Sequence, residues 1–213
     1  MVASGGFVSV MVLRNRPASQ DLDCFLNANS VGNWYEPVRS HMEQLIQQVG
    51  QHLGYIGKWA NDEVRWFLSL LDDPEDLFQQ SKRQGVVLYR DENLIIYAVL
   101  WEWVLVRKLK RLQMEAQPSR KEDWNDCVAI TKLLYDVNGG GLQREILTRF
   151  DHTAIEPPVE ENTVTGLRRL VGHFYRVDPF PNNDNETEDD GADDDDEGDD
   201  DDGDDDEGDD EDG

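Results

Sequence analysis

Two short motifs near the start of the chain have the residue types that phosphate and metal chemistry requires. A glycine pair, in Ser4-Gly5-Gly6, is followed after 14 intervening residues by an Asp-x-Asp motif at Asp21 and Asp23. Side chains alternate along a strand, so the two carboxylates would share one face and repel each other unless a divalent cation lay between them. Unblocked backbone N–H groups of a glycine turn before a helix suit a phosphate. Together the motifs predict a site for a metal ion and a triphosphate.

A structural interpretation of the same residues stays open at this point. Asp-x-Asp at the end of a strand also occurs in solvated turns, and glycine pairs occur in ordinary loops. The elements around the motifs therefore decide how far the catalytic interpretation can be taken.

Periodic patterns predict an α+β chain around the motifs. Two segments rich in β-branched and aromatic residues, VVLYR and LIIYAV, flank a polar turn and indicate an antiparallel hairpin. Apolar residues spaced by three and four predict an amphipathic helix, with Val38, Met42, Leu45, Ile46, Val49 and Leu53 on one face. Helices are predicted at residues 7–14, 37–53, 101–116 and 122–135, with others after 61–62, within 141–150 and within 163–177, and strands at 21–26, 86–90 and 94–99.

Four segments in this order resemble the nucleotidyltransferase fold, in particular small proteins related to abortive-infection toxins and antibiotic nucleotidyltransferases. The family signature of a glycine pair, a helix and Asp-x-Asp resembles SGGFVSVMVLRNRPASQDLDCF, and VRSHMEQLIQQVGQHLGYIGKWANDEVRWFL is similar to the stretch that follows. YAVLWEWVLVRKLKRL matches a strand-to-helix passage at Glu102 and Lys108, and RKEDWNDCVAITKLL matches a helix start at Asp123 and Asp126. The resemblance spans roughly residues 4–135.

The resemblance implies transfer of a nucleoside monophosphate from a nucleoside triphosphate to an unknown acceptor, which is a tRNA, a protein or a small molecule. It implies that one or two Mg2+ ions are held by the two carboxylates of the Asp-x-Asp motif. It implies a nucleotide-binding role for Lys108, although a basic helix face is an alternative. Asp126 is expected as an acid or base near the acceptor, or else as a partner inside its helix, whereas Asp123 suits the helix dipole without catalysis. The implied catalytic residues are Asp21, Asp23 and Asp126, the metal ligands Asp21 and Asp23, and the nucleotide-binding residues Ser4, Gly5, Gly6 and Lys108.

The chain departs from the family pattern in two places. Family members usually have a helix and an apolar strand before the glycines, whereas only four residues precede Gly5 here, so an N-terminally truncated fold is one expectation. The family's third carboxylate lies on a neighbouring strand, yet VVLYR and LIIYAV contain none. A catalytically inactive binding module of the same fold is therefore the second hypothesis.

The negative charge of the chain is concentrated at its C-terminal end. The formal net charge is −26, and residues 184–213 contain 22 acidic residues and no basic one. Such a segment cannot bury enough apolar surface to fold and is expected to be disordered. We expect three parts, a nucleotidyltransferase-like core at 1–137, a helical extension at 138–183 and the acidic tail at 184–213. A third hypothesis is that the tail binds basic partners such as histones.

Cysteine use and hydropathy bear on the compartment. The two cysteines, Cys24 and Cys127, provide no disulfide framework and no Cys-x-x-Cys metal spacing. The longest apolar stretches are shorter than the ~20 residues of a membrane span. We expect an intracellular protein, cytoplasmic or nuclear, with no membrane partner.

Overall fold

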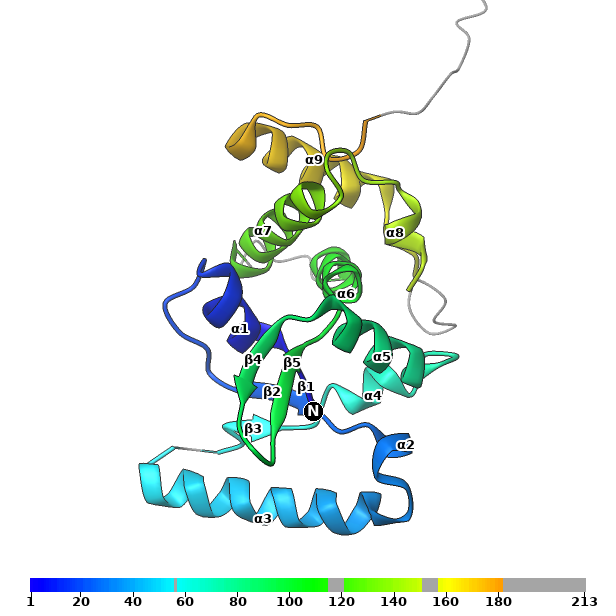
Figure 1. Cartoon of the computed structure of the whole chain (residues 1–213). Coiled ribbons are helices and arrows are strands. Elements are labelled where there is room, and N and C mark those ends of the chain that lie inside the picture. The colour runs from blue at the N-terminus through cyan, green and yellow to red at the C-terminus, as the bar shows by residue number, and fades with distance from the viewer. Residues whose placement is uncertain (56, 115–120, 151–156, 182–213) are drawn as a thin grey trace, which may run out of the picture. The chain divides into compact units, whose positions relative to one another are not determined.

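A five-stranded mixed sheet organises the chain, with helices on both sides of it (Figure 1). The computed structural model describes residues 1–55, 57–114, 121–150 and 157–181, and Met1–Pro181 forms one compact unit. The strand order is β3-β2-β1-β5-β4. The strands are β1 (Val2–Ser4), β2 (Leu22–Phe25), β3 (Ala60–Asn61), β4 (Val87–Arg90) and β5 (Ile95–Ala98). The predicted α+β class with a mixed sheet and helices is confirmed, while the predicted acidic tail lies outside the described residues.

The first strand is the centre of this sheet. β1 pairs antiparallel with β2 and parallel with β5, and its Val2 and Ala3 are completely buried. A central strand is covered on both faces, which explains why a short apolar sequence with no polar alternation forms it. The register places Ser4 opposite Asp23, so the end of β1 and the Asp-x-Asp motif meet.

The helices follow the predicted pattern in most places. The amphipathic segment is α3 (Tyr35–Leu53), and the two long helices after the hairpin are α6 (Trp101–Met114) and α7 (Lys121–Val137). The predicted helix at 7–14 is α1 (Gly5–Val8) continued by a π-helix, η1 (Ser9–Leu13). The remaining elements are α2 (Ala28–Val31), the 3-10 helix η2 (Gly32–Trp34), α4 (Arg65–Leu68), α5 (Pro74–Gln84), α8 (Glu145–Thr148) and α9 (Glu161–Tyr175).

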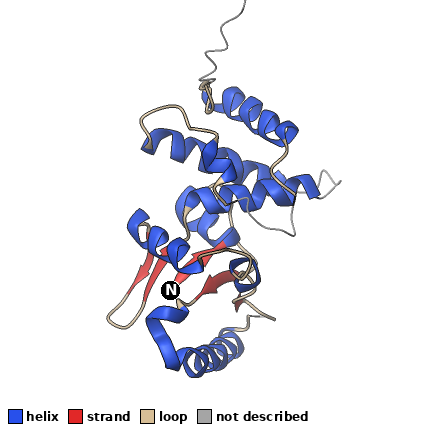
Figure 2. Ribbon diagram, turned by 90° about the vertical axis from the view of Figure 1, so that its right-hand side faces the viewer, coloured by secondary structure: helices blue, strands red, loops and turns tan. Residues whose placement is uncertain are grey.

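The main core lies between the sheet and the later helices. In both views α6, α7 and α9 lie on one side of the sheet and α3 lies on the other (Figures 1 and 2). Leu105 and Leu109 of α6, Ile130 of α7 and Leu167 of α9 are completely buried. Each such side chain stabilises the fold by about 1.5–3 kcal/mol relative to an exposed one. The described residues 138–150 and 157–181 therefore belong to the same packed body as the sheet.

The apolar face of α3 is less covered than its sequence pattern predicts. Val38, Leu45, Val49 and Leu53 have exposed fractions between 36 and 56%. Only Gly50 of this helix is buried, and there the Trp59 indole packs and donates a hydrogen bond to the Ile46 carbonyl oxygen. The amphipathic helix was predicted correctly, and most of its apolar stripe is exposed in the described structure. No helix in the described part of the chain is both long enough and apolar enough to cross a membrane.

Candidate functional site

The two N-terminal motifs meet at the end of β1. The chain leaves this strand at Ser4, which is buried, and enters α1 through Gly5, whose φ is +75°. A Cβ atom on Gly5 would lie 2.5 Å from Oδ2 of Asp23. The predicted neighbourhood of the glycine pair and the Asp-x-Asp motif is therefore present in three dimensions.

Close packing accounts for both glycines without any ligand. Gly5 has the left-handed backbone conformation that glycine tolerates best, and the Asp23 carboxylate occupies the space of its missing side chain. At Gly6 a Cβ atom would lie 2.7 Å from the Ser19 hydroxyl oxygen and 3.4 Å from Nη1 of Arg16. The glycine pair is thus required by the fold, and a phosphate-binding role would be additional.

Electrostatics at Asp23 are those of a carboxylate that lacks a counter-charge. Burial raises the pKa of Asp23, and the Asp21 carboxylate raises it further. A hydrogen bond from the Asn61 side chain and the more distant Arg111 charge act in the opposite direction but do not cancel the shift. A cation placed between Asp21 and Asp23 would remove this repulsion.

Asn61 is a site residue that the sequence analysis missed. It lies on β3, which pairs parallel with β2, and the register places it directly beside Asp23. Its side-chain oxygen accepts a hydrogen bond from the Glu63 backbone N–H at 2.9 Å. The family's third carboxylate was expected on the hairpin strands, but here the strand next to the Asp-x-Asp motif carries an amide. A two-residue strand gives no periodic signal, so only the pairing reveals this position.

The other predicted residues form a buried ionic cluster between α6 and α7. Lys108 is 4% exposed, and its Nζ lies 3.0 Å from Oδ1 of Asp123 and 2.7 Å from Oδ2 of Asp126. Asp126 is 0% exposed, and Asp123 is also buried. Buried charges persist only when they are paired and hydrogen-bonded, as these are. The structure therefore gives Lys108 and Asp126 a packing role, and their predicted nucleotide-binding and acid–base roles stay predictions.

An arginine from the N-terminal segment joins this cluster. Arg14 ends the π-helix in a left-handed conformation, with a φ of +53°, and turns the chain toward α7. Asn15 then donates a hydrogen bond of 2.8 Å to Oδ1 of Asp126, and Nε of Arg16 donates one of 3.0 Å to the same atom. Nη2 of Arg16 contacts the second oxygen, Oδ2 of Asp126. The Gly-Gly segment and α7 are locked together by this bidentate pair.

The basic partners set the titration of both aspartates. Burial alone would raise the pKa of Asp123, but the Lys108 ammonium and the Arg111 guanidinium outweigh it and hold that pKa at about 2. Burial likewise opposes ionisation of Asp126, yet hydrogen bonds from Arg16 and the Lys108 charge lower its pKa. Both carboxylates are therefore ionised near neutral pH, so neither is a proton donor in the state described.

The two carboxylates of the Asp-x-Asp motif suit Mg2+ only if other ligands complete its coordination shell. Within the described residues, no group of three or more His, Cys, Asp or Glu side chains could hold a metal ion. Mg2+ commonly uses only one or two carboxylates and completes its shell with water and substrate phosphates. Asp21 and Asp23 fit that pattern, which requires a bound nucleotide for a complete shell.

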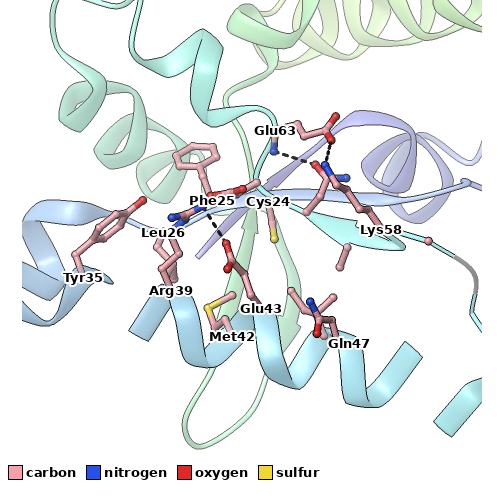
Figure 3. Close-up of a pocket in the computed structure, with 15 residues that line it drawn as sticks. Cys24, Phe25, Leu26, Tyr35, Arg39, Met42, Glu43, Gln47, Lys58 and Glu63 are labelled. Atoms are coloured by element: carbon pink, nitrogen blue, oxygen red, sulfur yellow. Dashed lines mark hydrogen bonds and ion pairs between the residues drawn. The ribbon is translucent and has the colours of Figure 1, made fainter. Parts of the chain in front are cut away.

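A pocket of about 420 Å³ lies on the opposite side of β2, between this strand, β3 and α3 (Figure 3). Its volume is that of a small-molecule site. Its charged side chains pair with one another, since Arg39 contacts Asp62 at 2.8 Å and Glu43 at 2.9 Å, and Lys58 contacts Glu63 at 2.8 Å. The lining includes Asn61, which neighbours Asp23 in the sheet, but neither Asp21 nor Asp23. The pocket therefore borders the site at Asn61 and contains neither carboxylate of the Asp-x-Asp motif.

The resemblance to the nucleotidyltransferase fold rests on the sequence motifs alone. Comparisons with protein-family models, with curated proteins and with solved structures found no significant match to this chain.

Proposed function

We propose that this chain is a nucleotidyltransferase that uses Mg2+ to move a nucleoside monophosphate from a nucleoside triphosphate to an acceptor. The observation that supports this most is the position of the Asp23 carboxylate over Gly5, with Asp21 just before the start of β2. This arrangement places two carboxylates that form no ion pair within the described residues next to the glycine pair at the start of α1. We also propose that the mixed sheet and its helices form a nucleotidyltransferase fold.

In this proposal Asp21 and Asp23 hold the metal, and Ser4, Gly5 and Gly6 bind the triphosphate. When bound, Mg2+ neutralises charge on the reacting phosphoryl group and clamps the attacking and leaving oxygens. Asp23 is held in place by its packing on Gly5 and by its hydrogen bond with Asn61. Such fixed placement supplies much of the catalysis in phosphoryl transfer, because little covalent chemistry falls to the protein.

One observation favours an inactive binding module as the alternative. The strand next to the Asp-x-Asp motif carries the amide of Asn61 beside Asp23, and the hairpin strands carry no carboxylate. An amide carries no charge and is a weaker metal ligand, so the chain could bind a nucleotide and transfer nothing. Retention of the biological phenotype by an Asp21→Asn, Asp23→Asn double variant would favour this alternative.

The proposed protein acts inside the cell, in the cytoplasm or the nucleus. Its acidic residues 184–213 are proposed to add contacts with basic partners. One feature of the chain supports each of these statements. Cys24 and Cys127 are both buried free thiols, and the 22 acidic residues would attract basic proteins at low salt.

A labelling experiment tests the proposed activity. Full-length protein is incubated with Mg2+, nucleoside triphosphates labelled at the α-phosphate, and tRNA, protein or small-molecule acceptors. We expect acceptor-bound label with wild type and with Asp91→Asn, a matched loss of one exposed carboxylate in the β4–β5 turn. The double variant at Asp21 and Asp23 should transfer none. Failure of wild-type protein both to bind nucleotides and to label any acceptor would end the proposal.

A further inference from the structure

Arg16 lies beside Gly6, Arg111 lies beside Arg16, and each is fixed by a buried aspartate. Arg16 is anchored by Asp126, and Arg111 is anchored by Asp123 through a contact of 2.6 Å between Nη2 and Oδ1. The aspartates are buried, whereas the arginine side chains are 18% and 46% exposed. Each guanidinium is therefore bonded to a buried carboxylate, while part of each arginine side chain stays exposed.

Arg16 presents one of its N–H groups to the glycine pair. Its Nε and Nη2 atoms are used by the carboxylate of Asp126. Its Nη1 atom makes no hydrogen bond within the described residues and lies 3.4 Å from where a Cβ on Gly6 would be. The Ser19 hydroxyl lies on the same side of Gly6. This hydroxyl already donates a hydrogen bond of 2.9 Å to the Asp21 carbonyl oxygen, so an anion next to Gly6 would meet mainly the guanidinium edge of Arg16.

Arg111 places a second guanidinium group beside that of Arg16. It lies on α6, and its Nη2 atom contacts Oδ1 of Asp123 at 2.6 Å, the same oxygen that lies 3.5 Å from Nη2 of Arg16. Lys108, one turn earlier on α6, is the basic residue that the sequence favoured. Its ammonium is buried and bonded to both Asp123 and Asp126, so it could reach a ligand only by breaking both of these buried ion pairs.

We propose that Arg16 and Arg111 bind the phosphate groups of the nucleoside triphosphate, and that Asp126 and Asp123 are the positioning residues that hold them. The inference rests on the proposed function and names its phosphate-contact residues. Guanidinium groups pre-oriented by carboxylates lose little freedom on binding, and they present parallel N–H donors that match phosphate oxygens. Lys108 then serves as the charge that keeps the two buried aspartates ionised.

Binding of inorganic tripolyphosphate to the full-length protein in EDTA tests this inference apart from metal chemistry. We expect Arg16→Gln and Arg111→Gln each to weaken the affinity about tenfold or more, as loss of a charge-assisted hydrogen bond does. Arg90→Gln removes the same charge from β4 at the far edge of the sheet and should change the affinity less than twofold. Arg111 is half-exposed on a helix, so its variant keeps the test valid even if the Arg16 variant folds poorly.

Coupling distinguishes positioning from a general structural role. If Asp126 acts through Arg16, Asp126→Asn should weaken tripolyphosphate binding in the wild-type background and have little further effect in the Arg16→Gln background. Equal losses in both backgrounds would contradict the positioning role. Wild-type protein that does not bind tripolyphosphate, or Arg16→Gln and Arg111→Gln variants that bind it as tightly as wild type, would overturn the inference.

The outcome is separable from that of the proposed function. The Asp21→Asn, Asp23→Asn double variant lacks two repelling charges and should bind tripolyphosphate in EDTA at least as tightly as wild type. Arginine-dependent binding together with no Mg2+-dependent nucleotide transfer would leave this inference standing and remove the proposed function. Nucleotide transfer that is unchanged in the Arg16→Gln and Arg111→Gln variants would support the proposed function and overturn this inference.

Discussion

The Asp23 carboxylate lies against Gly5, with its Oδ2 atom 2.5 Å from the position that a Cβ atom on this glycine would occupy. The contact joins two residues that are 18 positions apart in the sequence. Gly5 is the first residue of α1, and Asp23 lies on β2. The contact fixes the carboxylate at the point where β1 passes into α1. Its consequence is that Gly5 cannot be replaced without moving Asp23.

Gly5→Ala is expected to displace Asp23 as well as to strain the backbone. Gly54 is a matched control, because its φ of +74° equals that of Gly5 within a degree and no atom lies within 4 Å of a Cβ there. The strain common to both variants costs about 1–3 kcal/mol. Gly5→Ala should lose more than Gly54→Ala in the free energy of unfolding by urea, and only Gly5→Ala should impair nucleotide binding. Equal losses and intact binding in both variants would contradict the contact.

Asp126→Asn is expected to be strongly destabilising, because it leaves the Lys108 ammonium and the Arg16 guanidinium with one charged partner fewer in a buried site. Breaking one side of a buried ion pair costs about 3–5 kcal/mol. Asp136→Asn is the control, since Asp136 forms an exposed i,i+4 pair with Lys132 on the same helix, and such pairs contribute roughly 0.3–0.5 kcal/mol. Urea denaturation measures both, and similar small losses would mean that the cluster carries little energy.

Acid should weaken the fold through Asp123. Its pKa is about 2 in the folded protein, below the ordinary value of 3.8. A folded-state pKa below the unfolded one stabilises the protein at higher pH, and this stabilisation is lost as the pH falls from about 4 toward 2. A shift of roughly two units corresponds to about 2–3 kcal/mol. The difference in unfolding free energy between wild type and Asp123→Asn should therefore shrink by about that amount between about pH 5 and pH 2, and a constant difference would refute the pairing.

Asn61→Asp is expected to make the site depend on a cation. The new carboxylate would lie beside Asp23, whose pKa is already raised by burial and by Asp21. In EDTA the added repulsion should lower the melting temperature, by about 2–4 °C for each kcal/mol. Mg2+ should reverse this loss, and Asn93→Asp in the exposed turn before β5 should show neither effect. A loss that Mg2+ does not reverse would argue against a metal site at the Asp-x-Asp motif.

Local patterns made much of the fold predictable. The spacing of apolar residues in α3, the hairpin of β4 and β5 and the long helices α6 and α7 all follow from periodicity. α5 was not predicted, although the sequence contains two signals for a helix start. Asp73 caps the helix, and Pro74 occupies its first turn. The exposed stripe on α3 shows the limit of periodicity, since a pattern gives the apolar face but not what covers it.

The candidate site was only partly predictable, because its key contacts join distant parts of the chain. The glycine pair and the Asp-x-Asp motif could be associated from their spacing within one helix and one strand. The pairing of Arg16 with Asp126, 110 residues later, depends on how η1 packs on α7. Asn61 depends on the pairing of a two-residue strand. Neither relationship leaves a local signal in the sequence.

The most direct test of the metal-dependent nucleotide site is calorimetric titration of the full-length protein with a nucleoside triphosphate, with and without Mg2+. The Asp21→Asn, Asp23→Asn double variant is titrated in parallel and retains the same acidic residues at 184–213, so that nonspecific Mg2+ binding there is common to both. We predict binding that requires both Mg2+ and the two aspartates. Equal binding by the double variant, or no binding by the wild-type protein, would contradict the site.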